Sequence, residues 1–302
     1  MYGMETKSMK PINQNEHLLR RTLIAAAFAI FAVSAFGQGL NWEGQTGAFV
    51  TPFAYTSASS AGHLGHPQLA FHYLDGGSVV GNDFQISVTE GLLKRVEVGY
   101  TSALNASGSN TTLAPLFNNG FNVFHGKLNF LDENAGKQAW LPAVAVGFAA
   151  RTQVRRVGGV LNDKDTSNGD FYLVATKTVT QVKHLPFVLN AGVKETDASL
   201  LGIAGNAPNW SARGFGALGL VLSGPAKSKI VVGSEVAQQP HYIQNLPNAT
   251  LPTTLTYFAR VIPSTEHPLN IDFGVAQAAN RVLPGAQVGA RAQFAFGISY
   301  RL

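Results

Sequence analysis

The sequence predicts an all-β fold, a transmembrane antiparallel up-and-down β-barrel of about 12 strands (12–14). Three observations carry this prediction. Short runs of alternating apolar and polar residues recur along the chain, and the connections between them alternate between short and long. The chain also begins with an export-type segment and finishes on a strongly alternating one.

Strands dominate because no segment after residue 37 shows a sustained helical period with caps. The expected strands are Gln68–Leu74, Asp83–Thr89, Arg95–Ser102, Gly120–Phe130, Leu141–Arg151, Asp170–Val182, Pro186–Lys194, Gly214–Ser223, Lys229–Ala237, Thr253–Ile262, Leu269–Ala276 and Val288–Leu302.

The connections between these strands fall into two alternating classes. This strict alternation is typical of outer-membrane barrels, whose periplasmic turns are short and whose external loops are long. A sandwich with Greek-key crossings has no reason to show it. The short class comprises Glu90–Lys94, Asp132–Trp140, Lys183–Leu185, Gly224–Ser228 and Pro263–Pro268. The longer, polar class comprises Leu104–Asn119, Thr152–Gly169, Glu195–Arg213, Gln238–Pro252 and Gln277–Gln287.

One further apolar run, Gly47–Thr56, remains before these strands. As a strand it would make the total odd, which is unusual for bacterial single-chain barrels. Two interpretations stay open. The run is either the first strand, replacing one of the twelve, or a segment that enters the lumen or lies at the periplasmic mouth.

The first 37 residues are predicted to be a secretory signal peptide. Lys7, Lys10, Arg20 and Arg21 precede an apolar run, Leu23–Ala35, and small residues follow it. The run is shorter than the roughly 20 residues that a membrane-spanning helix needs. We therefore expect residues 38–302 to form a single barrel domain.

The last thirteen residues alternate along their whole length. Phe294, Phe296, Ile298, Tyr300 and Leu302 share one face of an extended chain. This segment resembles the closing strand of Gram-negative outer-membrane β-barrels, although Leu302 stands where Phe is usual. The resemblance implies location in the outer membrane, contact with its lipid, and recognition of the closing strand by the outer-membrane assembly machinery.

Alternation divides the strands into an apolar outer face and a polar inner face. The outer face includes Leu69, Phe71 and Tyr73, and aromatic residues such as Tyr100 and Trp140 at strand ends fit interfacial girdles. In a soluble sandwich the same face would be the core. The inner face is expected to carry pore-lining residues, because an Arg or Lys exposed to lipid near the midplane would cost roughly 2 to 4 kcal/mol. These residues are Arg95, Glu97, His125, Lys127, Arg151, Lys177, Lys194, Glu235, Arg260, Asp272, Arg291 and Arg301.

Bases outnumber acids in this set, so an open pore would favour anions. The alternative is that the charges pair into a network that fills a narrow barrel. Arg95 and Glu97, two residues apart, are expected to belong to such a network.

Several classes of function find no support. The net charge of +5 is too small to predict nucleic-acid binding, and the chain has no cysteine. No nucleophile motif, cofactor motif or metal-ligand set is present, and His63 and His66 lie in a Gly-containing loop without a third ligand. We therefore expect neither an enzyme nor a cofactor.

The function that follows from these patterns is a porin-like passive channel for small polar or anionic solutes. The alternative is a non-conducting structural or interaction barrel, associated with polysaccharide export or cell-surface contacts. The run Thr46–Ala54 resembles, loosely, the start of outer-membrane proteins linked to exopolysaccharide export. A lumen blocked by Gly47–Thr56 would favour this alternative.

Overall fold

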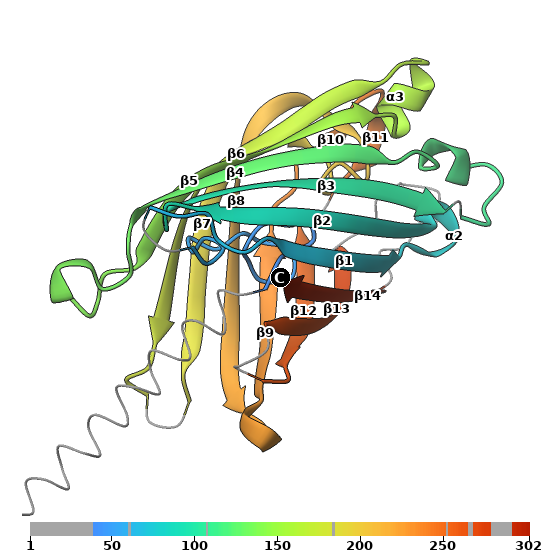
Figure 1. The fold of residues 1–302 in the computed structure, drawn as a ribbon. Helices are drawn as coiled ribbons and strands as arrows, with labels where there is room; N and C mark the ends of the chain where they lie inside the picture. The colour runs from blue at the N-terminus through green and yellow to red at the C-terminus, as the bar shows by residue number, and fades with distance from the viewer. Residues whose placement is uncertain are drawn as a thin grey trace, which may run out of the picture.

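The structure is a computed structural model that describes residues 39–59, 62–106, 108–182, 185–251, 253–264, 268–278 and 292–302. Twelve strands form a closed antiparallel barrel in the order β1-β14-β13-β12-β9-β8-β7-β6-β5-β4-β3-β2 (Figure 1). The barrel strands are β1 (Gln68–Asp75), β2 (Asn82–Leu92), β3 (Val96–Ala106), β4 (Phe121–Leu131), β5 (Ala143–Val154), β6 (Thr166–Val179), β7 (Phe187–Ala198), β8 (Asn206–Ser223), β9 (Lys229–Ala237), β12 (Thr254–Ile262), β13 (Leu269–Ala278) and β14 (Gln293–Arg301).

All twelve predicted strands are present, and the barrel closes where β14 pairs with β1. Strands next to the long loops extend further than expected. Thus β7 and β8 stay paired as far as Ala198 and Asn206, so that the loop predicted at Glu195–Arg213 shrinks to residues 199–205. The polarity of these residues predicts a loop. They form strand instead, because a strand that extends into water needs no apolar face. Residues 279–291 lie outside the described residues.

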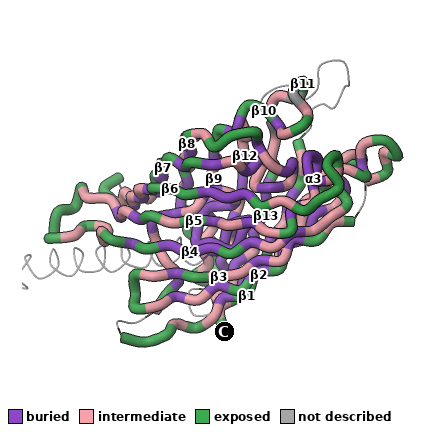
Figure 2. The backbone as a smooth tube through the Cα atoms, turned by 90° about the horizontal axis from the view of Figure 1, so that it is seen from above, coloured by how far each residue is buried: buried purple, intermediate pink, exposed green. Residues whose placement is uncertain are grey.

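The wall has the predicted two faces. In β2, Ile86 and Val88 are 54% and 41% exposed, whereas their neighbours Gln85, Ser87 and Thr89 are buried. Side chains point alternately outward and inward along a strand, and Figure 2 shows this alternation of burial along the tube. Exposed large apolar residues occur on every barrel strand except β12, where Tyr257 takes that place, so the barrel carries an apolar outer wall.

Connections at the two ends of the barrel differ. We call the end with the turns 93–95, 132–142, 180–186, 224–228 and 263–268 the turn end, and the opposite end the loop end. One loop-end connection, residues 76–81 between β1 and β2, is short, contrary to the predicted alternation, and contains α2 (Gly77–Val80).

At the loop end, three of the described loops pack together. α3 (Val157–Leu161) follows β5, and a hairpin that the sequence did not reveal, β10 (Tyr242–Ile243) and β11 (Leu246–Thr250), follows β9. Val157, Ala204, Ile243 and Leu251 from three loops form one buried apolar cluster. None of the helices in the described part of the chain is long and apolar enough to cross a membrane.

The run Gly47–Thr56 is not a barrel strand. It lies within the ring of strands, and its extended contacts are isolated bridges such as Gly47 with Pro52. In the structure its residues are mostly buried, and its amides bond to wall side chains such as Glu235 and Thr176. The even strand count is preserved because β14 closes directly onto β1.

Deleting Tyr300–Leu302 should prevent assembly of the barrel. The deletion removes the pairs of Tyr300 with Leu69 and Leu269, and the bond from the Leu302 amide to the Pro67 carbonyl. An open edge would then remain, and unpaired backbone groups cannot be left in lipid. The expected readout is loss of the heat-modifiable gel band from the membrane fraction. The control Tyr300→Phe should keep that band, and normal insertion of the truncated chain would contradict the prediction.

Candidate functional site in the barrel lumen

The lumen is filled by the chain's own residues 39–57, which we call the plug. Most plug residues are fully buried, among them Leu40, Thr46 and Phe53. The plug also holds itself together, since the Asn41 carboxamide oxygen accepts bonds from the amides of Glu43 and Gln45. At Tyr55 and Thr56 the chain reaches the turn end, where it contacts residues of the turns.

Apolar side chains of the plug pack against apolar side chains of the wall. Phe49 and Phe53 of the plug belong to the largest buried apolar cluster. The wall contributes to that cluster from β7, β8, β9, β12 and β14, through Val188, Val221, Val231, Phe258, Ile262 and Ala295. This packing removes two large plug side chains from water, which stabilises the plug in the barrel by roughly 1.5 to 3 kcal/mol for each aromatic ring.

Two buried wall acids bind the plug backbone. Glu97 of β3 accepts bonds from the amides of Thr46, at 3.0 Å, and Ser57, at 2.7 Å, and from the Thr46 hydroxyl. Glu235 of β9 accepts bonds from the amides of Val50 and Thr51 and from the Thr51 hydroxyl, at 2.7 to 3.0 Å. The irregular backbone of the plug has no neighbouring strand whose carbonyls could accept its amide hydrogen bonds, and these two carboxylates accept them instead.

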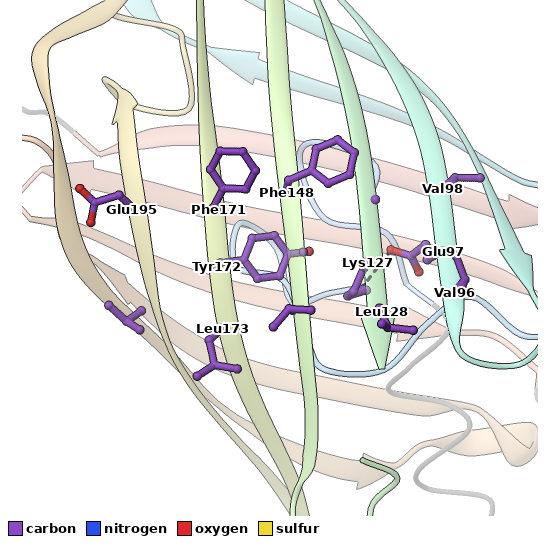
Figure 3. A pocket seen from close by; sticks show the side chains of 14 residues that line it. Val96, Glu97, Val98, Lys127, Leu128, Phe148, Phe171, Tyr172, Leu173 and Glu195 are labelled. Carbon is purple, nitrogen blue, oxygen red and sulfur yellow. Dashed lines mark ion pairs between the residues drawn. The ribbon is translucent and has the colours of Figure 1, made fainter. Parts of the chain in front are cut away.

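Two buried wall bases bind plug carbonyls. Lys127 of β4 donates to the Thr46 carbonyl at 2.9 Å and forms an ion pair with Glu97 at 3.0 Å (Figure 3). Arg260 of β12 donates to the carbonyls of Gly47 and Ala48 while its Nε pairs with Asp272 at 2.6 Å. A buried charge persists only when it is paired and hydrogen-bonded, and here the plug completes each pair.

Nearer the loop end, a plug acid joins a wall network. Glu43 forms an ion pair with Arg151 of β5 at 2.6 Å, and Arg151 also contacts Asp170 of β6 at 2.9 Å. Lys194 of β7 lies 3.3 Å from the same Asp170 carboxylate. Bidentate contact between Arg151 and Glu43 makes this the most directional attachment of the plug.

At the turn end, where the plug leaves the lumen, Tyr55 binds it to the wall. The Tyr55 hydroxyl donates to Glu133 at 2.8 Å and lies 2.9 Å from the Thr178 hydroxyl. Burial, and secondarily the nearby Glu133 charge, raise the pKa of the Tyr55 phenol well above its usual value. Tyr55 therefore stays protonated and can act as the donor to Glu133 at any physiological pH.

A tight turn of the plug depends on glycine. Gly44 has φ of +83°, and a Cβ added there would lie 2.7 Å from the Thr101 hydroxyl and 2.8 Å from the Ser87 Cβ. Both the backbone conformation and the close approach to the wall therefore require glycine at this position.

The structure distributes the twelve predicted luminal residues unevenly. Their role in a pore stays a prediction. Eight lie inside the barrel and are buried: Glu97, His125, Lys127, Arg151, Lys194, Glu235, Arg260 and Asp272. Arg301 occupies an inward position at the turn end of β14, and Arg291 lies outside the described residues.

Two predicted luminal residues do not face the lumen. Arg95 precedes β3, is about half exposed, and pairs with Asp132 in the next turn, so the expected network of Arg95 with Glu97 is wrong. Lys177 has the outward parity of β6, on which the inward positions are even-numbered, and its ammonium pairs with Glu133. A one-residue error in phase or boundary reverses the face of a side chain.

Charges that the sequence analysis missed change the electrostatics of the lumen. Glu43, Asp83, Arg156 and Asp170 are also buried, and Arg156 pairs with Asp83 at 2.9 Å. Among the described residues, the buried charged side chains are therefore five bases and six acids. The expected excess of luminal base is not present. Asp170 could have been found from its alternation with Tyr172 and Val174, whereas Glu43 has no strand periodicity to reveal it.

A small cavity of about 20 Å³ lies beside the plug, between Glu43, Pro52, Asp170, Lys194 and Phe215, and such a volume holds roughly one water molecule. A larger hollow of about 700 Å³ lies on the outer wall over β3 to β7, beside Val98, Phe148 and Leu173 (Figure 3). In the described residues no group of three or more His, Cys, Asp or Glu is placed to hold a metal ion.

Replacing Arg260 with Met should destabilise the barrel by about 3 to 5 kcal/mol, because Asp272 would remain buried without its partner. The measurement is the midpoint of denaturant unfolding in detergent micelles. The double variant Arg260→Met/Asp272→Leu should recover part of this loss, because no uncompensated carboxylate is left. A single-variant effect below about 1 kcal/mol would contradict the proposed importance of this pair.

Comparison with known proteins yields one family and distant structural likenesses. None of the curated proteins compared matches the chain. Among solved structures, a NanC porin matches with 10% identity and a TM-score of 0.44, over 78% of this chain and 100% of that one. The translocator domain of the autotransporter NalP from Neisseria meningitidis matches with 12% identity and a TM-score of 0.34, over 79% of this chain and 87% of that one. A family model matches residues 38–262, which include the plug and the strands from β1 to β12, and the chain belongs to that family, described as "Protein of unknown function (DUF3034)".

Proposed function

We propose that this protein is an outer-membrane β-barrel whose lumen is closed at rest by its own plug, and that it serves as a structural or interaction barrel. The observation that carries the proposal is the plug itself. Its backbone is bound by Glu97, Lys127, Glu235 and Arg260, which come from four different wall strands.

Location in the membrane is supported by the distribution of apolar surface. Outward residues such as Phe124, Phe148 and Phe273 are 40 to 48% exposed, whereas the buried charges lie inside. A soluble protein rarely leaves so extensive an apolar surface in contact with water. The predicted signal peptide, residues 1–37, agrees with export but lies outside the described residues.

A porin-like passive channel remains the second candidate and would require the plug to move. Its predicted preference for anions rested on an excess of luminal base, and the buried charges of the described residues are nearly balanced. Small anionic solutes are therefore proposed as cargo only for a barrel from which the plug has been displaced.

An association with polysaccharide export or cell-surface contacts stays part of the proposal. The segment on which that resemblance rests, Thr46–Ala54, is the part of the plug that Glu97 and Glu235 bind. A partner that recognises this segment would reach it from the turn end, where the plug leaves the lumen beside Tyr55 and Glu133.

Planar-bilayer recordings test the closed state. Wild-type protein should show little steady conductance. Deletion of residues 40–56 should produce open channels, and so should Gly44→Leu, which leaves every wall charge in place but cannot fit against Thr101 and Ser87.

Gly62→Leu is the matched control, because Gly62 has almost the same φ, +82°, but no atom of the described residues lies within 4 Å of an added Cβ. It should conduct as little as the wild type. Steady open-channel currents from the wild type would overturn the proposal, and so would assembled plug variants that conduct no better than Gly62→Leu.

A further inference from the structure

Side-chain charge is distributed unequally between the two ends of the barrel. At the turn end the described residues include seven bases, which we call the basic collar: Lys94, Arg95, Lys137, Lys177, Lys227, Lys229 and Arg301. Only three acids, Glu90, Asp132 and Glu133, accompany them in the described part of that end. Because the turns alternate around the closed sheet, the bases are spread around the rim.

The opposite end has the reverse balance. Among the described residues that are not buried, the loop end carries Asp75, Asp163, Asp165, Glu195 and Asp197 against Arg155, Lys164 and Arg213. The barrel is therefore electrostatically polar along its axis. Two collar bases, Arg95 and Lys177, already pair with Asp132 and Glu133, which neutralises two of the three acids.

The turn end also exposes large apolar side chains beside these bases. Trp140 is 72% exposed and stands just before β5, and Leu93 is 62% exposed next to Lys94. Val182 and Leu185 are exposed in the turn between β6 and β7. Tryptophan beside lysine is typical of the membrane–water interface, where rings lie at headgroup depth and ammonium groups reach the phosphates.

We propose that the basic collar binds the anionic headgroups of phospholipids in the leaflet at the turn end, with Trp140 and Leu93 inserted beside them. The collar attracts phosphate because each Lys or Arg near an anionic surface adds favourable electrostatic energy. This inference rests on the proposed membrane location, and it assigns the turn end to the leaflet that is richer in anionic phospholipid.

The choice of lipid over an acidic polymer follows from the exposed apolar groups. A soluble polyanion would neutralise the collar but would leave Trp140 and Leu93 in water. A phospholipid interface accommodates both the charges and the rings.

The experiment compares two lipids in contact with the reconstituted protein. Spin-labelled phosphatidylglycerol or phosphatidylcholine is added in trace amount to neutral bilayers, and electron paramagnetic resonance measures the motionally restricted fraction. The wild type should prefer phosphatidylglycerol by about threefold, and 1 M salt should reduce this preference because screening weakens exposed charges.

The collar variant Lys94→Gln/Lys137→Gln/Lys229→Gln should lose most of this preference. The matched control Arg155→Gln/Lys164→Gln/Arg213→Gln changes the net charge equally at the loop end and should retain it. Trp140 fluorescence, taken as the difference between the wild type and Trp140→Phe, should be quenched by lipids labelled near the headgroup.

The outcomes separate the two proposals. A protein that fails to insert as a heat-modifiable barrel would overturn the membrane location. An inserted barrel with no lipid preference, equal loss in both triple variants, or a collar that binds a soluble acidic polysaccharide but shows no phosphatidylglycerol preference would overturn the collar proposal alone.

Discussion

The structure depends on the mutual satisfaction of plug and wall. An irregular backbone inside a closed barrel has no ladder to pair with, and charges on a narrow luminal wall have no bulk water to solvate them. The wall side chains give the plug backbone its hydrogen-bond partners, and the plug backbone replaces water around the wall charges. Glu97 and Glu235 accept the plug's amides, while Lys127 and Arg260 donate to its carbonyls and keep their own acidic partners. Removal of either component would leave buried polar groups without partners.

The locations of apolar and charged side chains are the reverse of those in a soluble globular protein. The apolar surface faces outward, and the interior combines buried charges with apolar clusters, in the largest of which Phe49 and Phe53 pack. The two kinds of contact act on the plug differently. Apolar packing supplies non-directional attachment, whereas the bidentate contact between Glu43 and Arg151 specifies how the segment is oriented. A segment attached in both ways occupies one position rather than many.

The proposed closure of the lumen and the axial asymmetry of charge agree with a protein that works at its two ends. At the loop end three described loops pack together, and the turn end combines the basic collar with exposed Trp140. Such ends suit contacts with lipids and partners, which agrees with a barrel whose centre is occupied. The plug's exit beside Tyr55 and Glu133 is at the turn end, so events at that surface are close to the segment that closes the lumen.

Alternation with period two, repeated twelve times between turn-forming residues, was sufficient to predict the strands, their outer face and most inward charges, because side-chain direction along a strand is a local property. It was not sufficient for Arg95 and Lys177, where one residue of boundary or phase decides the face. The sequence by itself determined an antiparallel barrel with an apolar exterior. Only the tertiary structure decided that Gly47–Thr56 enters the lumen and that Glu43 meets Arg151, because these contacts join residues about a hundred or more positions apart, and no local pattern encodes them.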